Sequence, residues 1–231
     1  MAFYKACEKG NIDEVKLLLL DRSMDHNRRA DKHGRTLFHV ACRNGHLEIV
    51  KILLADPRID LCKPDNHGWT PFISACYNGH TDIVKILLDD PRIDLCKPNN
   101  DGWTPFYSAC RYGHLEIVKI LLADPRIDPC KPNNDGETPY YSACSNGHLE
   151  IVKILLADPR IDPCKPNNHG KTPLDVAREW NWETIIDLIT KHLSGLDIGP
   201  FTNRQFLYAS ANGNVEFMKN AMMRRPRKKL K

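Results

Sequence analysis

The sequence has no long hydrophobic run. Near the N-terminus the longest purely apolar stretch is Leu17–Leu20, whereas a membrane-spanning helix needs roughly 18 or more apolar residues. No leader with a charged part, an apolar part and a cleavage site precedes this stretch. We therefore expect a protein that is neither secreted nor inserted in a membrane, and that works inside the cell, in the cytoplasm.

The cysteines are not arranged as a disulfide framework or a zinc site would need. There are nine of them in 231 residues, which is an odd number, and no Cys-x-x-Cys pair is present. Small secreted disulfide scaffolds are usually shorter and have an even count. A reducing compartment fits better, and we expect no metal.

The sequence also lacks a glycine-rich phosphate loop and any Ser, His and Asp ordering above chance. The candidate pair Cys42 and His46 recurs in four near-identical copies, whereas catalysis needs one nucleophile and one base in a pocket. We therefore expect a protein that is not an enzyme, with no cofactor and no small-molecule substrate.

Net charge is small, and its distribution is uneven. The whole chain carries +4, but six positive charges lie in the last eight residues, RRPRKKLK at 224–231, so residues 1–223 carry −2. This basic tail fits a nuclear import signal or a nucleic-acid contact, and it fits a solubilising C-terminus equally well. Because of this tail, the nucleus is a second expected location of the protein.

Repetition is what the sequence has in abundance. The stretch GHLEIVKILLADPRID occupies residues 45–60, 113–128 and 147–162, with a near copy at 79–94. Five glycines follow one another at intervals of 34 residues: Gly34, Gly68, Gly102, Gly136 and Gly170. A fixed period of this size indicates an array of stacked repeats.

Each unit predicts two helices followed by a hairpin loop. In the unit from 67 to 100, Thr70 and the proline after it start a first helix, PFISACYN, which Gly79 ends. The second helix, from about 81 to 88, has an apolar stripe too broad for a free surface helix. Asp-Pro then ends it, and turn formers lead to the next Asp-Gly. The apolar faces of both helices require stacked neighbours.

Three units resemble ankyrin repeats: HGWTPFISACYNGHTDIVKILL, DGWTPFYSACRYGHLEIVKILL and DGETPYYSACSNGHLEIVKILL. The resemblance implies an all-α fold, an ankyrin-repeat solenoid of stacked helix-turn-helix units with short hairpin loops. Each unit is one residue longer than the usual 33. The family's histidine after Thr-Pro-Leu survives only as His39; the residues that replace it are Ile73, Tyr107, Tyr141 and Asp175.

The resemblance also sets the predicted boundaries. We predict a repeat stack over 1–193, with an N-terminal cap at 1–32 and repeats that start near 33, 67, 101, 135 and 169. Residues 194–223 are predicted to form a degenerate C-terminal unit because FLYASANGNVEFMKN, at 206–220, keeps part of the repeat spacing. Residues 224–231 form the basic tail.

Two further residue series recur with the period, and we interpret both as structural. Equivalent positions in stacked helical repeats lie on the order of 10 Å apart, which is too far for disulfides or shared metal ligands. The first cysteine series is therefore predicted to be small and buried: Cys42, Cys76, Cys110 and Cys144. The histidines after the loop glycine are predicted to cap the second helices: His46, His80, His114 and His148.

The positions that vary while their surroundings repeat are the candidates for binding. The resemblance places hairpin tips and the ends of the first helices along a concave groove, and Trp, Tyr and Arg dominate interface energetics. The predicted partner-binding residues are Arg35, Arg43, Trp69, Tyr77, Trp103, Arg111 and Tyr112. Arg35 and Arg43 would select an acidic feature, and the others would act as anchors. The alternative is that Trp69 and Trp103 only pack on their own loops.

We expect a monomeric, non-catalytic module that binds another protein in this groove. Two other functions stay open: a nuclear regulator that contacts nucleic acid or chromatin through 224–231, and a substrate-recruiting adaptor of a larger enzyme complex that docks through 194–223. The groove itself is not expected to bind nucleic acid, because Asp101, Asp135 and Glu137 would oppose phosphate.

Overall fold

The computed structural model describes residues 2–21 and 23–195, which contain twelve α-helices and no β-strand. Most of the predicted degenerate unit and all of the basic tail, residues 196–231, lie outside the described residues. Contacts group the chain into a first unit, residues 1–134, and a second unit, residues 135–231.

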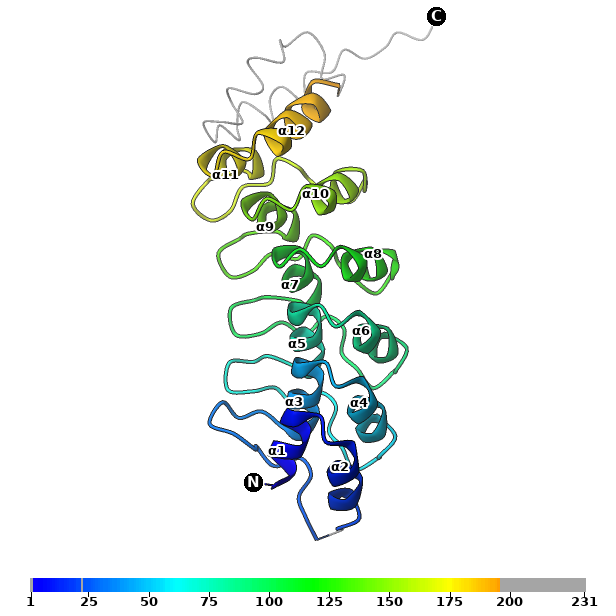
Figure 1. Ribbon diagram of the computed structural model, residues 1–231. Coiled ribbons are helices and arrows are strands. Elements are labelled where there is room, and N and C mark those ends of the chain that lie inside the picture. The colour runs from blue at the N-terminus through cyan, green and yellow to red at the C-terminus, as the bar shows by residue number, and fades with distance from the viewer. Residues whose placement is uncertain (1, 22, 196–231) are drawn as a thin grey trace, which may run out of the picture. The chain divides into compact units, whose positions relative to one another are not determined.

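The first unit consists of four helix pairs. Its helices are α1 Ala2–Lys9, α2 Ile12–Leu19, α3 Leu37–Asn44, α4 Leu47–Leu54, α5 Pro71–Asn78, α6 Thr81–Leu88, α7 Pro105–Arg111 and α8 Leu115–Ala123. Figure 1 shows α1, α3, α5 and α7 in one column and α2, α4, α6 and α8 in a second, with the hairpin loops projecting beside the first column. Within this unit each helix packs on its counterpart in the neighbouring pair.

The second unit contains two more pairs with the same design. They are α9 Pro139–Ser145 with α10 Leu149–Leu156, and α11 Pro173–Glu179 with α12 Glu183–Gly195. α11 packs on α9, and α12 packs on α10. The all-α, stacked helix-turn-helix prediction is therefore confirmed, and the bounds predicted for α5 and α6 agree with the structure.

Helix starts and stops follow the local sequence. The threonine of every Thr-Pro or Thr-Leu step accepts a hydrogen bond from the backbone N–H three residues later, at 3.0 to 3.2 Å. Gly79 ends α5 in the left-handed region, with φ of 78°. Asn181, which replaces this glycine in the last pair, also has a positive φ, 56°.

The loop histidines do not cap their own helices, so that prediction was wrong. His46, His80 and His114 occupy the N-cap position but make no side-chain cap bond. Each ring instead donates from Nε2 to a carbonyl of the preceding pair, on Glu8, Arg43 and Tyr77 respectively, at 2.8 to 2.9 Å. These carbonyls lie at helix C-termini, where intrahelical partners run out. The histidines therefore join one repeat to the next.

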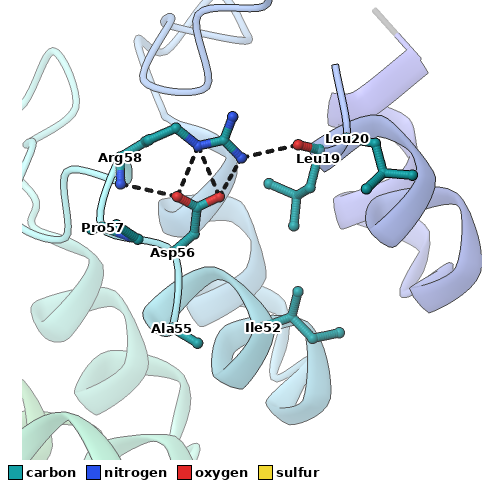
Figure 2. Close-up of a pocket in the computed structure, with 7 residues that line it drawn as sticks. All are labelled: Leu19, Leu20, Ile52, Ala55, Asp56, Pro57 and Arg58. Carbon is teal, nitrogen blue, oxygen red and sulfur yellow. Dashed lines mark hydrogen bonds and ion pairs between the residues drawn. The ribbon is translucent and has the colours of Figure 1, made fainter. Parts of the chain in front are cut away.

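The contacts of the Asp-Pro-Arg loops explain why this part of the repeated stretch recurs. Arg58 pairs with Asp56 at 2.5 Å and donates from Nη2 to the carbonyl of Leu19, at the end of α2, at 2.9 Å (Figure 2). Arg92 makes the corresponding bond to Leu54 at 2.9 Å. The loops that contain Arg58, Arg92 and Arg126 each complete the helix end of the preceding repeat in this way, which is why their sequence barely changes.

The hairpins also stack on one another. The backbone N–H of Asn100 donates to the carbonyl of His67 at 3.0 Å, and that of Asn134 donates to Asp101 at 3.0 Å. Gly102 has a φ of 81°, and a Cβ there would lie 2.8 Å from the backbone nitrogen of Asn134. At Gly68, Gly102 and Gly136 this approach leaves no room for a side chain, whereas Gly170 shares only the left-handed φ, 74°.

The departures from the family histidine have a structural use. Tyr107 and Tyr141 are buried, and their hydroxyls accept hydrogen bonds from the side-chain amides of Asn133 and Asn167 at 3.1 and 3.2 Å. These asparagines open the following hairpins. Each tyrosine therefore ties a first helix to the hairpin at the end of its own repeat.

Candidate functional site

All seven residues predicted to bind a partner lie in the first unit. Trp69 and Trp103 belong to the hairpins that precede α5 and α7. Tyr77 lies in the last turn of α5, and Arg111 and Tyr112 end α7. These side chains therefore come from the hairpins and the first-helix ends of consecutive repeats.

Four aromatic residues form one contiguous group, which we call the aromatic cluster: Trp69, Tyr77, Trp103 and Tyr112. Trp69 meets Tyr77 edge to face at 5.0 Å between ring centroids, and it meets Trp103 at 5.9 Å. Tyr77 and Tyr112 are 4.1 Å apart, and Trp103 and Tyr112 are 6.4 Å apart. Such pairs stabilise each other beyond their area burial, so the cluster is held in place before any partner arrives.

The aromatic cluster packs on the core on one side and is accessible to solvent on the other. Tyr107, which is fully buried, lies 5.4 Å from Trp103 and supports it from the core. Trp69, Tyr77 and Trp103 are half-buried, and Tyr112 is 39% exposed. Each tryptophan packs on rings from more than its own loop, because the cluster joins two consecutive repeats.

Arg111 completes the cluster. Its Cζ lies 4.8 Å from the ring centroid of Trp103, within the range of a cation–π interaction. The hydroxyls of Tyr107 and Tyr112 lie close enough to act on its charge. The pKa of Tyr77 is raised above its ordinary value, because its hydroxyl is hydrogen-bonded to Tyr112 and is partly removed from water.

The two other predicted arginines differ from each other. Arg35 is bound to Asp31, with Nε and Nη2 at 2.6 and 2.5 Å from the same carboxylate oxygen, and its side chain is only 17% exposed. Arg43 is half-buried and forms no ion pair with any described residue. Of the pair, Arg43 alone has its charge uncommitted to a carboxylate.

Sequence reasoning missed two exposed apolar surfaces. In the second unit Trp180 is 62% exposed; it occupies the repeat position of Tyr112, which is the signal that would have found it. In the first unit Leu20 is 76% exposed and borders an open hollow of about 740 Å³ between the ends of α2 and α4 (Figure 2). Its other lining residues are Leu19, Ile52, Ala55, Asp56, Pro57 and Arg58.

The cysteine and histidine series behave as scaffold residues. Cys42, Cys76, Cys110 and Cys144 are fully buried, as predicted, and burial raises the pKa of each thiol. The thiol of Cys42 is thus held protonated while His46 is bound to the preceding repeat. Within residues 2–21 and 23–195, no group of three or more His, Cys, Asp or Glu is placed to hold a metal ion.

Comparison with known sequences decides the family. A family model described as ankyrin repeats in three copies matches residues 1–65 and 56–133, and one described as ankyrin repeats in many copies matches residues 111–156. The chain belongs to the ankyrin-repeat family. Ankyrin repeats generally mediate protein–protein interaction and are typically non-catalytic.

Two further findings concern the ankyrin-repeat chain. A search of curated proteins found no significant match. In the described part of the chain, every helix is too short or too polar to span a membrane.

Proposed function

We propose that this ankyrin-repeat protein is a non-catalytic interaction module that binds a protein partner in the groove of its first unit. The aromatic cluster and Arg111 are the anchors. The observation that carries the proposal is the meeting of Trp69 and Trp103, from separate repeats, in one half-exposed group with Tyr77 and Tyr112.

The physical support is twofold. Large rings that already contact one another lose little conformational freedom on binding, so more of the contact energy is available for affinity. Trp, Tyr and Arg also contribute most of the energy at interface hot spots. Half-buried rings on a preformed surface supply both conditions at once.

The test compares binding by the intact chain with binding by a Trp69/Trp103/Tyr112 alanine variant. A matched control replaces Lys51, Lys85 and Lys119, exposed on the outer helices, with alanine. We expect the first variant to lose the partners that affinity capture retrieves with the intact chain, and the control to keep them.

Thermal unfolding of each variant separates loss of binding from loss of structure. The proposal fails if the aromatic variant retrieves the same proteins as the intact chain. A Trp69→Phe/Trp103→Phe variant keeps the ring packing. The proposal also fails if this variant and the alanine variant unfold alike and both still capture the same partners as the intact chain.

A further inference from the structure

Arg43, Tyr77 and Arg111 form a row. They occupy the same position in three consecutive repeats, 34 residues apart, at the ends of α3, α5 and α7. α3 packs on α5, and α5 packs on α7, so the three side chains follow one another along the stack. The positive charges of both arginines lie close enough to act on the Tyr77 hydroxyl.

A second hydroxyl joins this row. Tyr112 lies next to Arg111 in the chain, its ring is 4.1 Å from that of Tyr77, and its hydroxyl lies near the Tyr77 hydroxyl and the Arg111 guanidinium. Two guanidinium groups and two phenol groups therefore meet at one edge of the aromatic cluster. All four groups are hydrogen-bond donors, and the guanidinium groups have no acceptor capacity.

Arg43 has no carboxylate partner among residues 2–21 and 23–195. Glu8 precedes Arg43 in the row, and it accepts a hydrogen bond from Tyr4 at 3.2 Å but forms no ion pair with Arg43 in the described residues. Asp101 lies on the hairpin tip and accepts a bond from Asn99 at 3.4 Å. The hairpins of the first unit also carry Asp31, which pairs with Arg35, and Asp65, which accepts hydrogen bonds from the backbone of His67 and Trp69.

We propose that Arg43 and Arg111, with the hydroxyls of Tyr77 and Tyr112, bind one carboxylate side chain of the partner. An apolar side chain next to that carboxylate packs on Trp69 and Trp103. The occupant is thus an acidic peptide segment with Asp or Glu beside an aromatic or aliphatic residue. This inference rests on the proposed function and names the partner's chemistry.

The two guanidinium groups favour a single carboxylate in a site that the adjacent rings partly shield from water. Charge-assisted bonds from guanidinium to carboxylate are short and about twice as strong as neutral ones, and removal of water by the adjacent rings strengthens them further. A polyanion such as nucleic acid fits poorly, because Glu8 and Asp101 would repel the phosphates on either side.

The test is selection from a random dodecapeptide library displayed on phage, with the full chain immobilised. We expect enriched peptides to carry Asp or Glu within two positions of an aromatic or aliphatic residue. Synthetic copies of these peptides are then titrated calorimetrically against the full chain and its variants. Arg43→Gln should weaken binding at least tenfold, and Tyr77→Phe should weaken it by a smaller factor.

The control is Arg28→Gln, which removes an exposed arginine between α2 and α3 and should leave affinity unchanged. If enriched peptides depend on Trp69 and Trp103 but lack acidic residues and ignore Arg43→Gln, this inference fails and the proposed function stands. If acidic peptides bind a Trp69→Ala/Trp103→Ala variant as tightly as the intact chain, the proposed function fails as well. Enrichment of no peptide overturns both.

Discussion

Tyr140 and Tyr141 are neighbours on α9, and their hydroxyls have opposite environments. Tyr140 is 1% exposed, and its hydroxyl has no hydrogen-bond partner in the described part of the chain. The nearby Cys144 thiol is a weak acceptor that does not replace one. The hydroxyl of Tyr141 accepts a bond from the amide of Asn167 at 3.2 Å. We predict that removing the two hydroxyls changes stability with opposite signs.

The magnitudes follow from what each hydroxyl leaves behind. A buried polar group without a partner costs about 1–3 kcal/mol, and the equivalent positions of three other repeats hold the buried phenylalanines Phe38, Phe72 and Phe106. Tyr140→Phe should therefore stabilise the fold by about 1 kcal/mol. Tyr141→Phe leaves the buried amide of Asn167 unpaired and should destabilise it by about 1–2 kcal/mol.

The assay is thermal and urea unfolding of the full chain, followed by circular dichroism. A change of 1 kcal/mol corresponds to a shift in melting temperature of about 2–4 °C for a chain of this size. Repeat arrays can unfold in parts, so hydrogen exchange of the α9 amides should be measured as well. A loss of stability in Tyr140→Phe, or no loss in Tyr141→Phe, would refute the reasoning from hydrogen-bond partners.

Three further predictions concern the hairpins, the Asp-Pro-Arg loops and the thiols. Gly102→Ala should lower the free energy of unfolding by about 2–3 kcal/mol, because the site combines a left-handed φ with a close approach to Asn134. Gly170 has a φ of 74° and no atom within 4 Å of a Cβ, so Gly170→Ala should lower it by only about 1 kcal/mol. Equal losses in urea unfolding would contradict the stacking argument. The hydrogen bond from Arg58 lowers the pKa of Asp56 to about 2. Because the folded-state pKa is depressed, this loop's contribution to folding stability is complete above the ordinary aspartate range and is lost as pH falls toward 2. NMR titration of Arg58→Gln should show the pKa of the Asp56 carboxyl returning toward its ordinary value. An alkylating reagent should modify the half-buried loop cysteines of the native protein, Cys62, Cys96, Cys130 and Cys164. The buried thiols should react only after unfolding, as mass spectrometry would show. The protected set is Cys7, Cys42, Cys76, Cys110 and Cys144.

The candidate site was found in the sequence only in part. Trp69, Tyr77, Trp103, Arg111 and Tyr112 stand out because they vary inside a repeat whose other letters are fixed, and the structure brings them together. Arg35 was selected by the same pattern, yet its charge is bound to Asp31 four residues earlier. The pattern identifies which side chains differ between repeats, but it does not identify which of them already have a partner.

The sequence by itself determined the period, the helix bounds and the places where glycine is needed. These depend on residues within a few positions of each other, such as Thr70 and the backbone N–H of Ile73, and on their exact recurrence. The tertiary structure alone decided that His80 bonds to Arg43 and that Arg92 completes the end of α4 at Leu54. It also decided which of two adjacent tyrosines has a partner. Those contacts join residues about 26 to 38 positions apart, and only the packing geometry of stacked repeats fixes which atoms meet.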